Sequence, residues 1–309
     1  MRLYSFERQG EQRIGAEHDN QLVDLGSAAE ALEREQGSAG GTQEFFAGML
    51  GLIRAGDAGM NAARRAFQFA LRRDKSNPPL KIPFAEVRLL APIPRPGKIL
   101  CSGINYLSHK EENPSAVLPE SPFFFSKLPS VVIGPGAPII HPRATRQMDY
   151  EVEFAVVIGK VMHHTPEDAV MASIAGYTIL HDVSARDVQF KDNQITLGKN
   201  FDTFAPMGPC LVTADELAEP GNLRLRTFLN GKVMQDGSTR DWLFPLPKLL
   251  SALSQVMTLE PGDVVSTGTP AGVGVFRKPP VFLKPGDRVV LEIEGIGRLE
   301  NPVVGPAQT

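Results

Sequence analysis

Cysteine is scarce in this sequence, since its 309 residues include two, Cys101 and Cys210. Two cysteines cannot form a disulfide framework, and neither lies at the spacing of a zinc or redox motif. A reducing compartment fits this usage, and we expect the chain to be cytoplasmic. Long apolar runs are scarce as well, because the stretch 154–159 is far shorter than the ~18 residues that a membrane span needs. The N-terminal residues lack the apolar core of a signal peptide.

An excess of charge of either sign is also missing. Lys and Arg together number 32 and Asp and Glu number 35, which gives a formal net charge of −3. Charged residues make up 22% and hydrophobic residues 42% of the chain, as in ordinary folded proteins. This composition argues against a disordered chain, a nucleic-acid binder and a membrane-surface protein. Gly and Pro are abundant instead, with 29 and 26 residues, and they predict many turns in a β-rich body.

The spacing of apolar residues divides the chain into three parts. Residues 1–75 mix short β-like runs with helical spacing and predict a small α/β region. The prolines of residues 76–97 predict a connector, and residues 98–309 are dominated by predicted strands. The fold class expected is therefore α+β and rich in strand. The helices expected are 28–35, 43–55, 60–73, 166–173 and 247–257, and the Asn230-Gly231 pair predicts a hairpin turn.

Two glutamates share one predicted strand at residues 150–159. Because side chains alternate along a strand, Glu151 and Glu153 lie on the same face as Ala155 and Val157. Adjacent carboxylates on an apolar strand cost several kcal/mol unless a cation or a base neutralises them. An exposed strand with both glutamates over water is the alternative interpretation.

A third carboxylate, Asp182, ends the next predicted strand, 176–182. Beside the two glutamates it would complete a set of three oxygen donors for a hard divalent cation such as Mg²⁺, with positions left for water and substrate. His181 points to the opposite face from Asp182, so we expect it to be structural.

Several motifs between residues 98 and 304 occur in an order that resembles the fumarylacetoacetate hydrolase family. Each motif is weak alone, and the ordered set is specific. The motifs are Gly103-Ile-Asn-Tyr-Leu-Ser-His109-Lys-Glu-Glu112, Asp149-Tyr-Glu-Val-Glu153, Asp182-Val-Ser-Ala-Arg186-Asp-Val-Gln189, Gly198-Lys199-Asn-Phe-Asp202, Gly208-Pro209, Asn230-Gly231 with Gln235-Asp236-Gly237, Pro261-Gly262-Asp263 and Thr267-Gly-Thr269-Pro270.

The resemblance implies a mixed β-roll domain over residues 98–309 that binds Mg²⁺ (or Mn²⁺) and acts on small 2-oxo acids. It also implies a homodimer and a place in aromatic catabolism. The implied metal ligands are Glu151, Glu153 and Asp182. The implied catalytic residues are His109, Glu112 and Lys199, and the implied substrate-binding residues are Arg186, Gln189 and Thr269.

The implied dyad of His109 and Glu112 lies on a short predicted helix, where a three-residue spacing puts both side chains on one face. There the carboxylate can fix the imidazole tautomer and raise its basicity. Residues 103–121 have few large apolar anchors and several prolines, so we expect them to be mobile without ligand and to close over it.

The function expected is hydrolysis of a carbon–carbon bond in a 2,4-dioxo acid of the acylpyruvate or fumarylpyruvate type. The acid would chelate the metal, His109 would activate water, and pyruvate enolate would leave beside Lys199. Oxaloacetate decarboxylation and isomerisation or tautomerisation of an oxo-diacid are alternatives, because each passes through an enolate in the same site. A non-catalytic, metal-stabilised binding protein is a more remote alternative.

Overall fold

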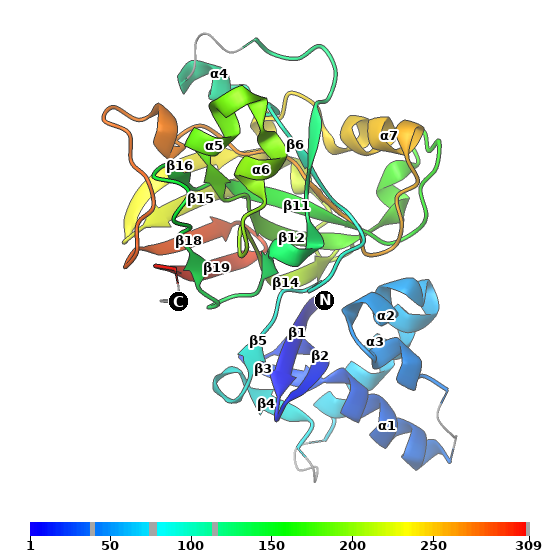
Figure 1. The fold of residues 1–309 in the computed structure, drawn as a ribbon. Coiled ribbons are helices and arrows are strands. Elements are labelled where there is room, and N and C mark those ends of the chain that lie inside the picture. The colour runs from blue at the N-terminus through cyan, green and yellow to red at the C-terminus, as the bar shows by residue number, and fades with distance from the viewer. Residues whose placement is uncertain (38–40, 74–78, 113–116, 307–309) are drawn as a thin grey trace.

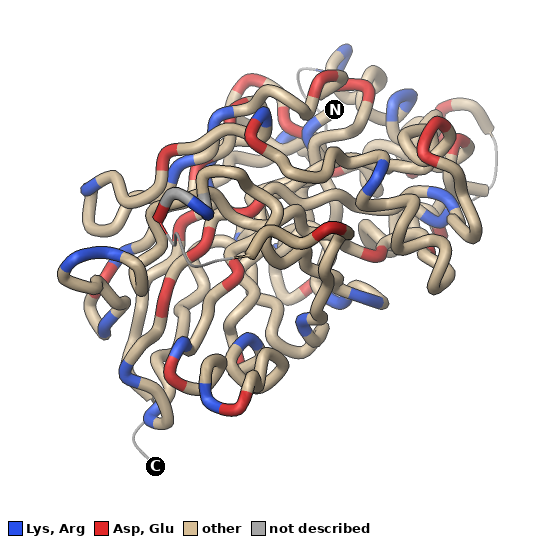
Figure 2. The backbone as a smooth tube through the Cα atoms, turned by 90° about the horizontal axis from the view of Figure 1, so that it is seen from above, with Lys and Arg blue, Asp and Glu red and all other residues tan. Residues whose placement is uncertain are grey.

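The computed structural model describes residues 1–37, 41–73, 79–112 and 117–306. Its architecture is α+β with mixed sheets, which confirms the expected fold class (Figure 1). A twelve-stranded sheet runs through the molecule, and a five-stranded sheet shares a hydrophobic core with it. Within the described residues no helix is long and apolar enough to cross a membrane. Basic and acidic positions are interspersed along the backbone, in keeping with the small net charge (Figure 2).

The N-terminal part supplies one end of the large sheet and three helices that pack beside it (Figure 1). Helix α1 begins after Asp24, whose carboxylate accepts a hydrogen bond from Ser27 N at 3.0 Å and so caps the helix. All three predicted helices of this part are present, the second beginning as a 3₁₀ turn. The elements are β1 (Arg2–Arg8), β2 (Glu11–His18), β3 (Gln21–Asp24), α1 (Leu25–Gln36), α2 (Met49–Arg54) and α3 (Gly56–Leu71).

The predicted connector takes part in the sheet. Strand β4 (Lys81–Pro83) pairs with β3, and β5 (Arg88–Leu89) pairs with β1. Pro83 is tolerated because β4 is an edge strand, where a missing N–H need not break a ladder. Strand β1 also pairs with β14 (Ala205–Thr213), so the N-terminal strands continue the sheet of the later part. A separate folding unit over residues 1–75 stays a prediction.

The centre of the large sheet positions the acidic residues. Its strand order continues from β14 through β12 (Ile174–His181), β11 (Val152–Ile158), β17 (Val264–Ser266) and β6 (Ile99–Ser102) to β7 (Phe124–Lys127). The short strand β8 (Val132–Ile133) pairs with β14. Every residue of β11 is buried, because cores cover both faces of the sheet.

The two faces of β11 are those that the sequence predicts. Ala155 and Val157 belong to the core beneath the N-terminal helices. Val152 and Phe154 belong to the core shared with the five-stranded sheet. That second sheet has the order β16 (Lys232–Ser238), β15 (Arg224–Leu229), β18 (Arg288–Ile293), β19 (Gly297–Val304) and β9 (Ile139–Ile140).

Local signals explain the turns and shorter helices. Asn230 and Gly231 have φ of 51° and 83° between β15 and β16, which confirms the hairpin. Helix α7 (Leu246–Val256) confirms the expected helix at 247–257. The helix expected at 166–173 is wrong: those residues form a 3₁₀ turn at Val170–Ser173, because β12 begins too soon for a helix to propagate.

Three short helices gather at the end of the molecule away from the N-terminal part (Figure 1). They are α4 (Ser108–Glu112), α5 (Arg186–Phe190) and α6 (Ile195–Lys199). A two-stranded ladder of β10 (Met148–Asp149) and β13 (Ser184–Ala185) joins the segments that lead into β11 and α5. This ladder brings Asp149 and Arg186 to the same place.

Candidate active site

Three buried carboxylates meet where β11 and β12 pair. Val152 pairs with His181 across the two antiparallel strands, and Asp182 N donates to Glu151 O at 3.1 Å. Glu151 precedes β11, Glu153 lies within it, and Asp182 follows β12. All three line one cavity of about 280 Å³, so the structure brings the predicted acidic residues together.

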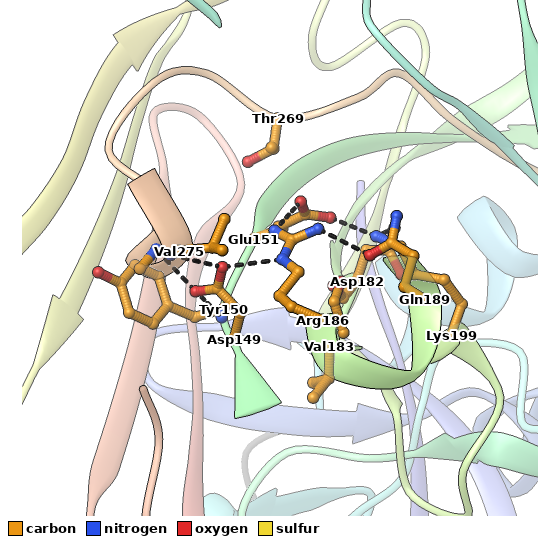
Figure 3. A network of polar contacts seen from close by, with 12 residues as sticks. Asp149, Tyr150, Glu151, Asp182, Val183, Arg186, Gln189, Lys199, Thr269 and Val275 are labelled. Atoms are coloured by element: carbon orange, nitrogen blue, oxygen red, sulfur yellow. Dashed lines mark hydrogen bonds and ion pairs between the residues drawn. The ribbon is translucent and has the colours of Figure 1, made fainter. Parts of the chain in front are cut away.

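Two buried cations enter this cavity from α5 and α6 (Figure 3). Lys199 Nζ lies 2.6 Å from Glu151 Oε2 and 2.6 Å from Asp182 Oδ2. Arg186 Nη2 lies 2.5 Å from Glu151 Oε1, and its Nε lies 2.9 Å from Asp149 Oδ2. The predicted catalytic lysine and the predicted substrate-binding arginine therefore both contact predicted metal ligands.

Asp149 anchors the arginine. Besides the ion pair with Arg186, its carboxylate accepts hydrogen bonds from Tyr150 N at 2.8 Å, Gly274 N at 2.7 Å and Val275 N at 3.1 Å. Sequence reasoning quoted Asp149 as part of a motif and assigned it no role. The backbone donors that reveal its role come from a loop more than 100 residues away.

Lys127 is a second residue that sequence reasoning missed. Its side chain is 1% exposed, and Nζ donates to Asp182 Oδ1 at 2.6 Å, Lys199 O at 2.6 Å and Val183 O at 3.2 Å. Asp182 is thus held between two ammonium groups. The sequence signal for this residue was a lysine in the apolar segment of β7. A lysine is rarely fully buried unless it is paired, so this position indicated a buried partner of opposite charge.

The two glutamates differ in their surroundings. Burial acts to raise the pKa of Glu151, but Arg186 and Lys199 outweigh it and hold the pKa well below its usual range. Burial raises the pKa of Glu153 well above its usual value, and the charges of Asp182 and Glu151 add to the effect. Glu153 accepts a hydrogen bond from Ser266 Oγ. The positive charges of Arg186 and Lys199 therefore neutralise Glu151 and Asp182 more than they neutralise Glu153.

The donor set fits a hard divalent cation. Ligand atoms of Glu153, Asp182 and Cys101 all lie within 4.8 Å of one another. Ligands of a metal must be ionised, and three ionised carboxylates carry one negative charge more than Arg186 and Lys199 together neutralise. An anionic substrate would be repelled from such a wall, and a bound divalent cation would make the net charge of the site positive. Glu151 borders the same cavity, but its oxygens face Arg186 and Lys199 and lie outside the cluster around Cys101.

The remaining predicted substrate contacts lie in the cavity wall. Gln189 accepts a hydrogen bond from Arg186 Nη1 at 3.1 Å. Thr269 Oγ1 donates to Val152 O at 2.9 Å and accepts from Gln235 Nε2 at 2.8 Å. Ser102, which was not predicted, lines the cavity as well, and its buried Oγ has no hydrogen-bond partner among the described residues.

The predicted dyad is placed in part. Helix α4 carries His109 and Glu112, and Glu112 Oε2 accepts a hydrogen bond from Gly272 N at 2.6 Å. That bond ties α4 to the loop that follows Thr269. The side chain of His109 and residues 113–116 lie outside the described part of the chain. The catalytic role of the dyad and the mobility of residues 103–121 stay predictions. His181, expected to be structural, is 1% exposed and is not among the residues of the cavity wall.

Comparison with known proteins agrees with this geometry. The model of the fumarylacetoacetate hydrolase C-terminal domain matches residues 98–304. The chain belongs to the fumarylacetoacetate hydrolase family. A human relative named mitochondrial oxaloacetate tautomerase FAHD2A is 47% identical over 259 residues, which cover 83% of this chain and 79% of that protein. The relatives include proteins named as a tautomerase and as a hydrolase, and the expectation that this chain is an enzyme is confirmed.

Two solved structures show the same fold over the whole chain. A fumarylacetoacetate hydrolase from Exiguobacterium antarcticum has a TM-score of 0.80 and 34% identity, covering 99% of this chain and 100% of that chain. A maleylpyruvate hydrolase from Sphingobium sp. SYK-6, solved with manganese(II) and pyruvate, has a TM-score of 0.76 and 30% identity, with coverage of 99% and 100%. The family resemblance drawn from the motifs is therefore confirmed.

Proposed function

We propose that the protein is a divalent-metal-dependent enzyme that interconverts the keto and enol forms of a 2-oxo acid, with oxaloacetate as the first substrate to test. The observation that carries the proposal is the cavity itself, where three carboxylates, Lys199 and Arg186 surround a space of about 280 Å³. A space of this size suits a small acid. The 47% identity to a protein named oxaloacetate tautomerase favours tautomerisation over the hydrolysis expected first.

The metal ligands proposed are Glu151, Glu153 and Asp182, and the cation proposed is Mg²⁺ or Mn²⁺. When bound, it supplies Lewis-acid polarisation of the 2-oxo group. Manganese(II) in the Sphingobium hydrolase supports a cation of this kind. A homodimer, a cytoplasmic location and a role in aromatic catabolism remain proposals, and the human relative's name places that protein in mitochondria.

The side chains of the cavity would divide the remaining work. Lys199 and Arg186 present N–H donors toward the negative charge that develops as the enolate forms. The hydroxyl of Thr269 would donate to the substrate carboxylate after turning away from Val152 O, and Gln189 would add an amide in the same cavity wall. His109, oriented by Glu112, would take the proton from C3, and a proton returned to the oxygen at C2 completes the enol.

Hydrolysis of a 2,4-dioxo acid is the second candidate. It is favoured by the 30% identity over 99% of this chain to a protein named maleylpyruvate hydrolase. Here His109 would take a proton from water, which then attacks the 4-oxo carbon. Lys199 and Arg186 would stabilise the enolate that leaves.

Product analysis separates the candidates. Purified protein with Mn²⁺ is given oxaloacetate or acetylpyruvate, and products are followed by nuclear magnetic resonance in deuterated buffer. Tautomerisation predicts faster deuterium exchange at C3 of oxaloacetate without extra pyruvate. Pyruvate and acetate in equal amounts from acetylpyruvate would show hydrolysis, and pyruvate from oxaloacetate would show decarboxylation. Exchange no faster than in buffer would contradict the tautomerase proposal.

A further inference from the structure

The sequence motif Gln235-Asp236-Gly237 lies on β16, where its side chains alternate between the two faces of the strand. Asp236 faces solvent and forms an exposed ion pair. Gln235 faces inward and is 1% exposed. A Cβ atom at Gly237 would lie 2.4 Å from Pro270 Cβ, so the glycine lets β16 approach the loop that carries Thr269. The inward residues of this motif therefore lie behind the wall of the acidic cavity, which Thr269 lines.

The Gln235 amide uses both acceptor and both donor positions. Its Oε1 accepts hydrogen bonds from Val152 N at 3.0 Å and Thr227 Oγ1 at 2.7 Å. Its Nε2 donates to Thr269 Oγ1 at 2.8 Å and Pro270 O at 2.9 Å. A backbone N–H can only donate and a backbone carbonyl can only accept. Val152 and Pro270 therefore fix which end of the amide is oxygen.

The orientation of this amide determines what the hydroxyl of Thr269 offers a ligand. The hydroxyl oxygen accepts the hydrogen bond from Gln235 Nε2, and its single proton is donated to Val152 O at 2.9 Å. Thr269 lines the cavity, so a ligand can reach it. A ligand group that takes the place of Val152 O must accept that proton. A carboxylate is a better acceptor than Val152 O, because hydrogen bonds to ionised groups are stronger than those to neutral carbonyls.

The same amide holds the strand that carries the proposed metal ligands. Val152 lies between Glu151 and Glu153 in the sequence. Its N–H donates to Gln235, and its carbonyl accepts from Thr269. Val152, Gln235 and Thr269 thus form a closed ring of hydrogen bonds. Groups that orient the ligands of a metal change its affinity without touching it, so Gln235 is placed to act on metal and substrate together.

We propose that Gln235 is a positioning residue with two tasks. It holds Thr269 as a hydrogen-bond donor to the substrate carboxylate, and it holds the backbone between the two metal-binding glutamates. Gln235 is not among the described residues of the cavity wall, so its effect passes through Thr269 and Val152. The proposal rests on the proposed function, in which a 2-oxo acid binds beside a metal in this cavity.

Binding of oxalate, which mimics the enolate of a 2-oxo acid, tests the substrate task by calorimetry on the Mn²⁺-loaded protein. Thr269→Val removes the hydroxyl and should raise the Kd about tenfold, the effect of a lost hydrogen bond to a charged group, whereas Thr269→Ser should keep the Kd within about twofold. Gln235→Met should also raise the Kd about tenfold, because the hydroxyl is no longer held as a donor. Adding Thr269→Val to Gln235→Met should cost about threefold at most, since both changes remove the same interaction.

The Kd of Mn²⁺ without oxalate tests the metal task. Gln235→Met should raise it about tenfold, because Val152 N loses the acceptor that orients the strand between the metal ligands. Asp236→Asn is the matched control, since Asp236 is 42% exposed on the same strand, and neither Kd should change. If Gln235→Met does not fold, Gly237→Ala takes its place. The added Cβ would displace Pro270, so oxalate binding should weaken while Mn²⁺ binding is kept.

The outcomes separate the positioning role from the proposed function. An unchanged oxalate Kd in Gln235→Met and in Gly237→Ala, or losses in Gln235→Met and Thr269→Val that multiply in full, overturns the positioning role. The rate of enol oxaloacetate loss is measured on the same proteins. A wild type that binds oxalate and does not accelerate this loss overturns the tautomerase function and leaves the positioning role standing. A wild type that binds no oxalate in the presence of Mn²⁺ overturns both.

Discussion

Replacing Lys127 by methionine is the sharpest test of how the acidic site is held together. Lys127 Nζ bonds Asp182 Oδ1 and the carbonyls of Val183 and Lys199 at 2.6, 3.2 and 2.6 Å. These contacts tie β7 to the end of β12 and to the end of α6. Lys127→Met keeps much of the side-chain volume and removes the buried charge together with all three hydrogen bonds.

The magnitude follows from what remains after the change. Breaking a buried ion pair by removing one partner costs about 3–5 kcal/mol. Asp182 keeps Lys199 at 2.6 Å, which favours the lower end of that range. We therefore expect the free energy of unfolding of the metal-free protein to fall by about 3 kcal/mol. Bound Mn²⁺ supplies charge to Asp182, so the deficit should shrink in the loaded protein.

Urea unfolding of the wild type and Lys127→Met, each without metal and with saturating Mn²⁺, measures both effects. Lys160→Met is the control, because Lys160 is 59% exposed and lies 4.0 Å from Asp57, which is also exposed. Its loss should be less than about 1 kcal/mol. If Lys127→Met in the metal-free protein costs no more than Lys160→Met, then the buried ammonium does not hold Asp182 in place and the reasoning is wrong.

Four further substitutions address the metal, the proton transfer and the substrate. Glu153→Gln should abolish Mn²⁺ binding in calorimetry. Ser266→Ala removes the hydrogen bond to Glu153 and should weaken Mn²⁺ binding about 10- to 100-fold. Wild-type affinity in either variant would refute the role of the residue that was replaced. His109→Ala should lower the rate of keto–enol conversion of oxaloacetate by roughly 10²–10⁴-fold, because it removes the base proposed to exchange the proton at C3, and an unchanged rate would refute that role. Ser102→Ala should raise the Kd of the 2-oxo acid about fivefold, the effect of one lost hydrogen bond of about 1 kcal/mol, and an unchanged Kd would leave that hydroxyl without a role.

The acidic residues of the site could be predicted from the sequence because their placement depends on strand periodicity. A period of two places Glu151 and Glu153 on one face, and a chain turn puts Asp182 at the end of the neighbouring strand. The structure has all three in one cavity. The family motifs added Lys199, Arg186, Gln189 and Thr269, which line the same cavity.

The parts that were missed depend on contacts between distant segments. Lys127 meets Asp182 across 55 residues, and Gly274 N meets Asp149 across 125 residues. No local pattern encodes such pairs. The short strands β4 and β5 within the connector were not predicted, because proline signals mark breaks in structure and do not reveal short edge strands. The helix expected at 166–173 failed because the start of β12 competes with it.

Stopped-flow relaxation of enol oxaloacetate measures directly whether the protein enolises a 2-oxo acid in a metal-dependent way. The enol absorbance is followed after mixing with Mn²⁺-loaded wild type, EDTA-treated wild type, Glu153→Gln and the control Glu292→Gln, whose glutamate lies on β18 outside the cavity. We expect rapid loss of the enol with the loaded wild type and the control, and the rate of buffer alone with the EDTA-treated wild type and Glu153→Gln. A full rate after EDTA treatment or in Glu153→Gln would contradict it.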